Sequence, residues 1–593
     1  MRGAPLSAWS LPQQPQRPRT RGRGRRASRR PVSRTACLSG LVALAGLLLP
    51  CAWPGVVWAQ ARVLDQGDPG QIERRIEQRR TPKPQAAPAL ELPAPSRATP
   101  ATETESFILT AVVVEGATVF GPDAIGPLYE GQLAQRTTLA DVETIVSAIT
   151  RLYQDGGFLL SRAVAPPQDL AGGVLRVRVI EGFVDKVTLE GEPPLRRFVA
   201  YGDRIRDERP LSRSTLERNV LLINDLPGVS ASPGIRPLDE EAGRYELVLA
   251  IEQDAIDGNV YLDNRGTPAV GRLQSWASVA TNDLLGFSER LQLGHFSVPN
   301  QPRELQYAEL AYDQPLGTQG TTLASNLSFT FVDAGDDLDA LDVESRSNGL
   351  SLSLRHPVLR SRDESLWLSG GFDIRNTWQK LLGFTVLEDR LRVFRARGLY
   401  SIADDLEGTN LFQLEVSQGV SGLGASKAGS PQLSRPDGHS AFTKLGATLM
   451  RLQAIGESFG LQLTAAGQWS STALLSSEEF ALGGSQFGRA FDFAELTGEH
   501  GVAGSAELIY GHNFDNDWLS GFQLYGFYDA GAVWNEGSGG ADGEMLHSIG
   551  GGLRLRLGAW GLATLEVAKP LNREVASTES AGPRVFFSLS VSF

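Results

Sequence analysis

The stretch RVFFSLSVSF, residues 584–593, has the pattern of a strand whose two faces meet different surroundings. Apolar side chains occupy every second position, at Val585, Phe587, Leu589, Val591 and Phe593, and the intervening positions hold Arg584, Phe586 and three serines. Because successive side chains of a strand point to opposite faces, one face is apolar and the other is mostly serine. This alternation favours a transmembrane barrel, where lipid contacts one face and water the other, over a soluble sandwich, which can show the same pattern.

The composition of the chain is compatible with a barrel and excludes a bundle of membrane-spanning helices. The 593 residues are 41% hydrophobic. After residue 60, no stretch approaches the roughly 18 consecutive apolar residues of a spanning helix. From residue 254 to 593, alternating segments such as GLSLSLR (349–355) and GLRLRLG (552–558) recur between polar loops. Membrane strands need about 9–11 residues, so this region predicts about sixteen strands.

Residues 1–59 are predicted to be a secretory signal peptide. They contain ten Arg and no Asp or Glu, and an apolar core and small residues precede the expected cleavage after Ala59 or Ala61. Both cysteines, Cys37 and Cys51, fall in this leader, so no disulfide is expected in the rest. Without the leader, the chain has 46 basic and 68 acidic residues, which gives a net charge of −22. Such a chain is a poor partner for nucleic acid.

A polar helix and a linker are expected next. Within residues 60–80, the segment QIERRIEQRR has Ile72 and Ile76 as its only apolar residues, one helical turn apart. A helix this polar is either solvated or enclosed in a wet cavity. Residues 81–105 are rich in Pro and Ala, which predicts an extended, semi-rigid linker.

Two small α+β units are predicted between the linker and the barrel, at residues 106–182 and 183–253. The first combines the β-rich run FILTAVVVEG, the amphipathic helix TLADVETIVSAITRLYQDGG and two further strands. The second repeats this plan with FVDKVTLEG, the helical STLERNVLLINDLPG, a loop and the strand RYELVLAIEQ. Two successive units with one plan indicate an internal repeat.

Two segments near the carboxyl end contain the candidate site residues. The first is a long loop, LGGSQFGRAFDFAELTGEHG, residues 482–501, with Arg489-Ala490-Phe491 at its centre. The second is the strand segment Phe527-Tyr528-Asp529-Ala530-Gly531, in which the first, third and fifth residues share one face. A carboxylate that faces lipid is energetically unfavourable, so this face is expected to line the lumen.

With these motifs, the order of signal peptide, polar helix, Pro-rich linker, paired repeats and barrel resembles the TpsB transporters of two-partner secretion. These are the haemolysin and filamentous-haemagglutinin secretion proteins, in the same superfamily as the BamA and TamA insertases. The resemblance covers residues 62–593 and includes a weaker match at Asp263-Asn264-Arg265-Gly266. It implies that the repeats are POTRA-like domains and that residues 60–80, with Ile72 and Ile76, form a plug in the barrel.

The resemblance also implies a loop–barrel lock inside the lumen. In this family the Arg of the loop tip pairs with the Asp of the strand, which corresponds to Arg489 and Asp529 here. Phe491, Phe527 and Gly531 complete the matched positions, and the Gly would leave room for the incoming loop. The family's tip has Gly where this chain has Ala490, and Ala restricts the positive φ values that Gly tolerates.

The predicted fold is therefore mainly β: a sixteen-stranded transmembrane barrel at residues 254–593, preceded by two POTRA-like domains and a plug helix. The implied function is export of a partner exoprotein, of adhesin or haemolysin type, from the periplasm across the bacterial outer membrane without nucleotide hydrolysis. The expected partners are this exoprotein, outer-membrane lipid and the barrel-assembly machinery; no nucleic acid, metal or cofactor is expected. An insertase of the BamA or TamA type and a passive porin-like channel remain alternatives.

No enzymatic activity is predicted. The sequence contains no phosphate-binding loop of the G-x-x-x-x-G-K-[ST] type and no H-E-x-x-H motif. GESFG, residues 456–460, matches the G-x-S-x-G nucleophile elbow, but an elbow joins a strand to a helix. Here the segment joins two alternating strands, so a hairpin turn is expected.

Overall fold

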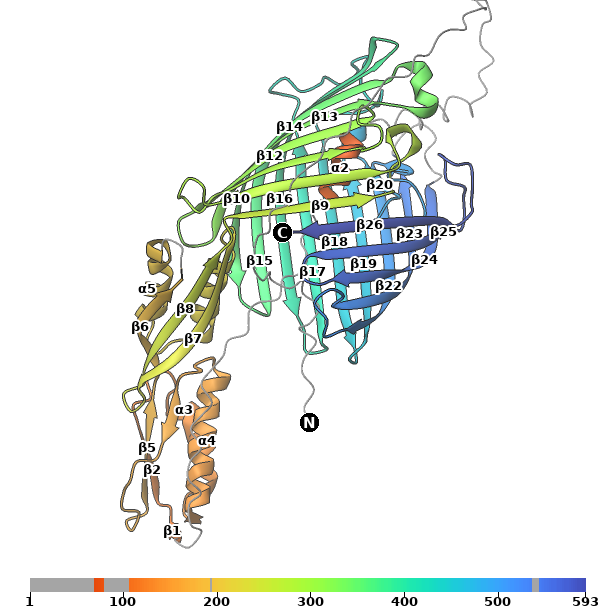
Figure 1. Cartoon of the computed structure of the whole chain (residues 1–593). Coiled ribbons are helices and arrows are strands. Elements are labelled where there is room, and N and C mark those ends of the chain that lie inside the picture. The colour runs from red at the N-terminus through yellow and green to blue at the C-terminus, as the bar shows by residue number, and fades with distance from the viewer. Residues whose placement is uncertain (1–68, 79–105, 192–194, 536–542) are drawn as a thin grey trace, which may run out of the picture.

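The computed structural model of the protein describes residues 69–78, 106–191, 195–535 and 543–593, which form an elongated arm joined to a large barrel (Figure 1). The predicted signal peptide (1–59) and Pro-rich linker (81–105) lie outside the described residues, as does the side chain of Ile76. In the part of the chain that is described, no helix is long and apolar enough to cross a membrane.

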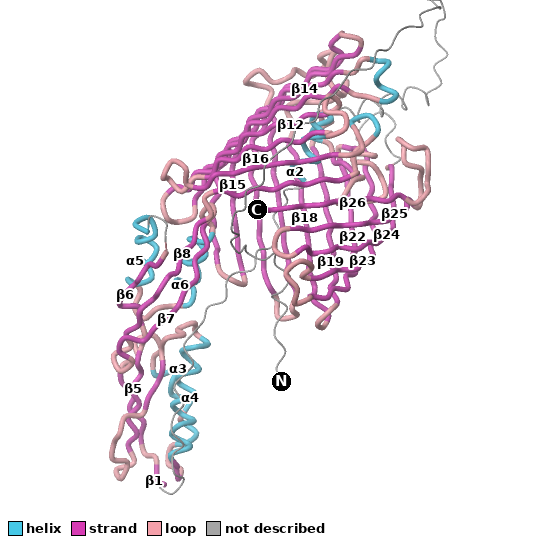
Figure 2. The backbone as a smooth tube through the Cα atoms, in the orientation of Figure 1, coloured by secondary structure: helices cyan, strands magenta, loops and turns pink. Residues whose placement is uncertain are grey.

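Within the described residues, sixteen antiparallel strands close into one barrel, which confirms the predicted architecture (Figure 2). Its strands are β9 (Ile256–Asp263), β10 (Gln274–Asn282), β11 (Arg290–Ser297), β12 (Leu305–Leu316), β13 (Thr321–Asp333), β14 (Glu344–Arg360), β15 (Glu364–Leu381), β16 (Phe384–Ala403), β17 (Gly408–Gly419), β18 (Thr443–Ile455), β19 (Phe459–Ser470), β22 (His500–Asn513), β23 (Gly521–Trp534), β24 (Glu544–Leu557), β25 (Gly561–Pro570) and β26 (Arg584–Ser592). Pairing of β26 with β9 closes the ring.

The alternation in the sequence separates the two faces of this wall. Val279, Leu293, Leu310 and Leu327 are aligned by register on four neighbouring strands and are all exposed. We call these four residues the lipid-facing row. One position along, Glu309 of β12 is buried and points to the other face, as the period of two requires. The wall is therefore apolar outside and polar inside, as a membrane barrel must be.

The arm contains two units of the same topology. The first has the sheet β2-β5-β4 and the second has the sheet β6-β8-β7; in each, the central strand runs parallel to one edge and antiparallel to the other. The elements of the first unit are β1 (Ser106–Ile108), β2 (Ala111–Glu115), α3 (Pro122–Ile125), η2 (Gly126–Leu128), η3 (Glu130–Gln132), β3 (Arg136–Thr138), α4 (Leu139–Asp155), β4 (Arg162–Val164) and β5 (Val174–Ile180). Those of the second are β6 (Phe183–Glu190), η4 (Leu195–Phe198), α5 (Val199–Asp207), α6 (Arg213–Asn224), β7 (Val229–Asp239) and β8 (Arg244–Gln253).

Helix α4 follows the predicted amphipathic pattern. Thr138 caps its amino end in a capping box with Asp141, and the helix stops before Gly156. Ile145, Ile149 and their neighbours on the same face are buried against the sheet of the first unit. Local capping and the apolar stripe therefore agree, which explains why this helix is evident from the sequence.

The second unit differs from the prediction at two places: helix α5 lies in a segment for which no element was predicted, and the segment after α6 is not a loop. The expected loop after α6 is strand β7, which pairs with β8 along most of its length. Pro233 and Pro237 are compatible with this strand, because β7 is the edge of its sheet, where a missing N–H costs no ladder hydrogen bond. The prediction of a loop was therefore wrong.

A partly buried carboxylate at the end of the first unit is hydrogen-bonded within that unit. Glu181 accepts hydrogen bonds from the backbone N–H groups of Thr118 (2.7 Å) and Val119 (3.0 Å), from the Thr118 hydroxyl and from the Tyr153 hydroxyl (2.7 Å). Although burial raises the pKa of Glu181, the Thr118 and Tyr153 donors outweigh it and hold that pKa below 4.5. Burial and the neighbouring Glu181 raise the pKa of Tyr153.

The second unit is fastened to one end of the barrel, which we call the arm-side end. Arg360, at the end of β14, donates to Asp225 through Nε (2.9 Å) and Nη2 (2.6 Å). Arg204 of α5 donates to the carbonyl of Thr318 (2.8 Å), in the turn between β12 and β13. A bidentate Arg–Asp contact is geometrically specific, so these bonds define how the arm meets the barrel.

Candidate functional site

A long segment between β19 and β22, residues 471–499, folds into the barrel, and we call it the inward loop. It contains η7 (Ser476–Glu478) and a ribbon of β20 (Phe480–Leu482) paired with β21 (Leu496–Gly498). Phe487, Ala490 and Phe491 of the inward loop are buried in one apolar cluster with Phe527 of β23 and Leu546 of β24. Apolar packing thus holds the tip against the wall, and the polar contacts below add specificity.

The structure brings Arg489 and Asp529 into direct contact. Asp529 Oδ2 accepts from the Arg489 backbone N–H (3.0 Å) and from Nε (3.1 Å), and Oδ1 accepts from Nη2 (2.9 Å). The guanidinium carbon also lies 3.5 Å from the ring centroid of Phe527, a cation–π contact. Arg489 is 6% exposed and Asp529 is fully buried, so little water competes for these bonds.

A second carboxylate, which the sequence analysis did not identify, completes the pairing. Arg489 Nη1 forms an ion pair with Glu507 of β22, and Glu507 also accepts from Arg554 (2.7 Å). Ser505, two residues away on the same face, donates to Asp529 (2.8 Å). Period-two alternation places Glu507 in the lumen, but only the three-dimensional register brings it to the loop tip. Two carboxylates therefore share the charge of Arg489.

Close contacts and backbone conformation explain why small residues occupy three positions of the lock. A Cβ on Gly531 would lie 2.6 Å from Cδ2 of Leu482, so this Gly makes room for the inward loop. Ala490 has no positive φ, so Ala is compatible with the conformation there. The residue with a left-handed backbone is instead Gly488 (φ +77). A Cβ at this position would also lie 2.4 Å from Cδ1 of Leu546.

Two further arginines hold the backbone of the tip. Arg265, in the segment matched at the first barrel strand, donates to the carbonyl of Arg489 (3.1 Å). Arg584, the first residue of β26, donates to the carbonyl of Ala490 (2.9 Å) and to Asp492 (2.7 Å). The tip is thus bound by strands from both sides of the β9–β26 junction as well as by β22 and β23.

Helix α2 (Pro69–Gln78) lies in the barrel interior (Figure 1). Ile72 is buried in a cluster with apolar residues of the wall, among them Phe296 and Tyr307. Glu73, only 2% exposed, pairs with Arg375 of β15 (3.1 Å) and accepts from the hydroxyl of Thr330 of β13 (2.6 Å). The carboxylate of Glu73 therefore finds partners on the barrel wall, as a buried charge requires.

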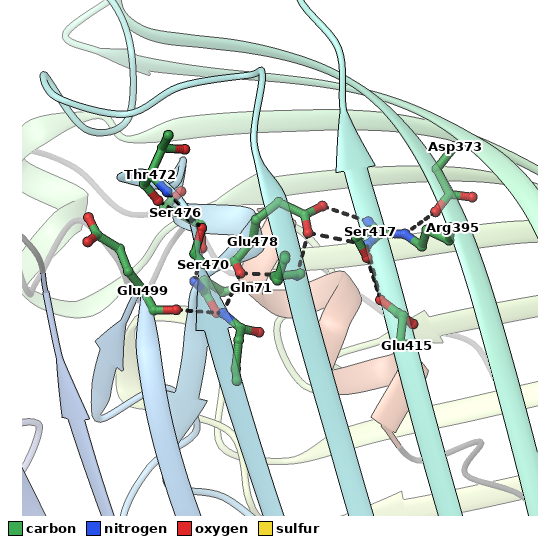
Figure 3. A network of polar contacts seen from close by, with 12 residues as sticks. Gln71, Asp373, Arg395, Glu415, Ser417, Ser470, Thr472, Ser476, Glu478 and Glu499 are labelled. Carbon is green, nitrogen blue, oxygen red and sulfur yellow. Dashed lines mark hydrogen bonds and ion pairs between the residues drawn. The ribbon is translucent and has the colours of Figure 1, made fainter.

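The same helix contacts the inward loop (Figure 3). Gln71 donates to the carbonyl of Ser476 (2.5 Å) at the start of η7. Two residues on, Glu478 is 3% exposed and pairs with Arg395 of β16 (2.6 Å) and Lys444 of β18 (2.5 Å). Arg395 in turn reaches Asp373 (2.5 Å) on β15. The inward loop is thus fastened to the wall a second time, at strands β16 and β18.

Other candidate chemistry in the sequence has a structural role. Gly456-Glu457-Ser458 forms the hairpin turn between β18 and β19, as predicted for the G-x-S-x-G match. Among the described residues, no three His, Cys, Asp or Glu side chains are grouped as metal ligands would be.

Comparison with known proteins agrees with this architecture. Residues 247–555 match the family described as haemolysin secretion/activation protein ShlB/FhaC/HecB, and residues 107–182 match the ShlB-type POTRA domain. The chain is 23% identical to the heme/hemopexin transporter protein HuxB of Haemophilus influenzae, over 87% of this chain and 93% of that protein. It is 25% identical to the outer membrane transporter CdiB of Escherichia coli, over 77% of this chain and 78% of that protein.

Solved structures share the fold. CdiB from Escherichia coli superposes with a TM-score of 0.68 at 20% identity, covering 92% of this chain and all of that one. CdiB from Acinetobacter baumannii gives a TM-score of 0.59 at 15% identity, with 92% of this chain covered.

A sixteen-stranded barrel with an inward loop and an amino-terminal POTRA arm defines an outer-membrane transporter whose POTRA domains lie in the periplasm. The chain belongs to the ShlB/FhaC/HecB family of haemolysin secretion/activation proteins, the transporters of two-partner secretion. The arm-side end of the barrel is therefore its periplasmic end.

Proposed function

We propose that this transporter exports one large exoprotein, of adhesin or haemolysin type, and that α2 closes the lumen at rest. The observation that carries the proposal is the position of Glu73, buried inside the barrel against Arg375. A buried carboxylate needs a charged or hydrogen-bonding partner, and here the wall supplies it. Departure of α2 then opens a polar route for an unfolded chain, and the Arg489–Asp529 lock keeps the inward loop in place.

The arm supplies an edge that can receive the cargo. Strand β2 is the edge of its sheet, contains no Pro, and exposes Val113. Unpaired backbone groups along such an edge bind an extended peptide by strand addition with little demand on its sequence. Edge strand β7 is less suited, because Pro233 and Pro237 lack the N–H donors that pairing requires.

Features of the described residues support export over the alternatives. The arm between residues 106 and 253 has two POTRA-like units, whereas insertases of the BamA or TamA type usually have more. A passive porin would need neither the arm nor a helix paired to its wall. We further propose that the protein acts without catalysis, that outer-membrane lipid covers the lipid-facing row, and that the barrel-assembly machinery inserts the barrel.

Conductance in planar lipid bilayers tests the plug. Deletion of residues 62–80 should raise single-channel conductance, and Glu73→Gln, which removes the charge that pairs with Arg375, should raise the frequency of open events. Glu457→Gln, the same charge change at an exposed periplasmic turn, serves as the matched control and should leave both unchanged. Equal conductance of the deletion variant and the natural protein would show that α2 is not the plug.

A further inference from the structure

The periplasmic turn between β10 and β11, residues 283–289, presents large apolar side chains to the outside, and we call it the apolar turn. Leu284, Leu285 and Phe287 are 64%, 62% and 66% exposed. They are thus at least as exposed as members of the lipid-facing row such as Leu293, at 56%. Three adjacent apolar side chains of this size on a tight turn are unfavourable in water, so the turn is built for another environment.

Four backbone N–H groups of the apolar turn are paired within the turn itself. Glu289 is 1% exposed, and its carboxylate accepts from the backbone N–H groups of Leu285 (2.5 Å) and Phe287 (3.0 Å). Asp283 accepts from the N–H of Ser288 (2.7 Å), and its own N–H donates to the carbonyl of Glu289 (2.7 Å). These N–H groups are thus already paired, which backbone groups next to lipid require.

The apolar turn lies where the barrel wall is short. Strands β9, β10 and β11 contain 8, 9 and 8 residues, against 17, 18 and 20 for β14, β15 and β16. A membrane strand needs about 9–11 residues, so β9 and β11 each fall short of the hydrocarbon thickness. Val279 and Leu293 of the lipid-facing row lie four residues from either end of the turn. The apolar surface therefore extends from the row towards the turn.

We propose that the apolar turn inserts into the periplasmic leaflet of the outer membrane, with phospholipid as its occupant. The turn is also joined to the arm: Arg197 of η4 pairs with Asp283 (2.5 Å) and donates to the hydroxyl of Ser288 (3.2 Å). Insertion consequently fixes the height of the second POTRA-like unit beneath the membrane. This role is independent of cargo export and would hold whichever protein is transported.

Lipid-borne quenchers test the insertion directly. Cys37→Ser and Cys51→Ser remove the cysteines of the sequence, so that Phe287→Cys can carry a single environment-sensitive fluorophore. The full chain is reconstituted in vesicles of phosphatidylethanolamine and phosphatidylglycerol, with or without phospholipid bearing a doxyl group near the headgroup. Fluorescence at position 287 should be quenched as strongly as at Leu293→Cys, and far more than at Arg362→Cys, an exposed position in the turn between β14 and β15.

Two results would overturn the proposal. One is quenching at position 287 equal to that at position 362, which would place the turn in water. The other is a fluorophore that responds only when an unfolded exoprotein segment is added, which would make the turn a cargo site. A variant with Leu284, Leu285 and Phe287 all changed to Ser provides a second readout: a fluorophore at Val199→Cys on the arm should lose at least half of its quenching by headgroup doxyl lipid. Heat-modifiable migration of this variant in gels checks that its barrel has assembled.

Discussion

Replacing Arg489 by Ala tests whether the loop–barrel lock is needed for export. The change removes the Arg489 side-chain bonds to Asp529, its ion pair with Glu507 and its cation–π contact with Phe527. Asp529 keeps the backbone N–H of position 489 and the hydroxyls of Ser505 and Ser548 as donors, all of them neutral. A fully buried carboxylate would therefore remain without a cation.

The magnitude follows from that unpaired charge. Removing one member of a buried ion pair costs about 3–5 kcal/mol. Since about 1.4 kcal/mol corresponds to a factor of ten, the docked position of the inward loop should become two to more than three orders of magnitude less favoured. Asp529→Ala should be milder, because Arg489 keeps Glu507 as a partner. The double variant should be no worse than Arg489→Ala, since it also removes the unpaired carboxylate.

Export and assembly must be measured together. We expect Arg489→Ala to reach normal outer-membrane levels, because the strand ladder is untouched, while little exoprotein appears in the medium and the inward loop becomes sensitive to protease. Arg397→Ala is the matched control: Arg397 is half-exposed, its partner Glu415 keeps Arg395 as a cation, and exposed pairs contribute about 0–1 kcal/mol. Natural levels of export by both Arg489→Ala and Asp529→Ala would refute the role of the lock.

Two further predictions concern Gly531, which makes room for the inward loop, and Glu181 of the arm. Gly531→Ala should displace Leu482 at a cost of about 1–3 kcal/mol and expose the inward loop to protease, whereas Gly446→Ala, with open space around it, should have no effect. Glu181→Gln should lower arm stability at neutral pH by about 1.5–3 kcal/mol, measured as faster hydrogen exchange of the Thr118 amide. Because the pKa of Glu181 is below 4.5 in the folded arm, the stability it provides is present above pH 4.5 and lost as the pH falls through the folded pKa. The natural protein should therefore lose its advantage over the variant in acid; a constant difference at all pH values would contradict this.

The sequence predicts elements whose local signals agree, and it fails where distant segments decide. Strand β26 and helix α4 have a clear period and, for α4, a capping box, so both are evident without coordinates. Strand β7 is hidden by its prolines, because nothing local shows that it lies at a sheet edge. Helix α5 has a polar sequence, and its place in the fold depends on tertiary packing.

In the candidate site, too, some contacts can be predicted from sequence motifs and others depend on the fold. The resemblance of two motifs is enough to pair Arg489 with Asp529, and their contact in the structure agrees with it. The two motifs do not indicate Glu507. Its position beside Arg489 depends on the register of β22 against β23, which the sequence does not show. The contact between Gln71 and Ser476 joins residues 405 positions apart, and no local pattern could have indicated it.

The distribution of contacts indicates which part of the closed barrel moves first. The inward loop is fastened at two places by buried charges, at Arg489 to β22 and β23 and at Glu478 to β16 and β18. Helix α2 meets this loop through a hydrogen bond from Gln71 to a backbone carbonyl and meets the wall through Glu73. Departure of α2 breaks this hydrogen bond, at about 0.5–1.5 kcal/mol, and one buried ion pair, Glu73 to Arg375, whereas departure of the inward loop breaks several buried ion pairs. We therefore expect α2 to leave the lumen while the inward loop stays docked, so that loss of the helix and loss of the lock would be two separate defects.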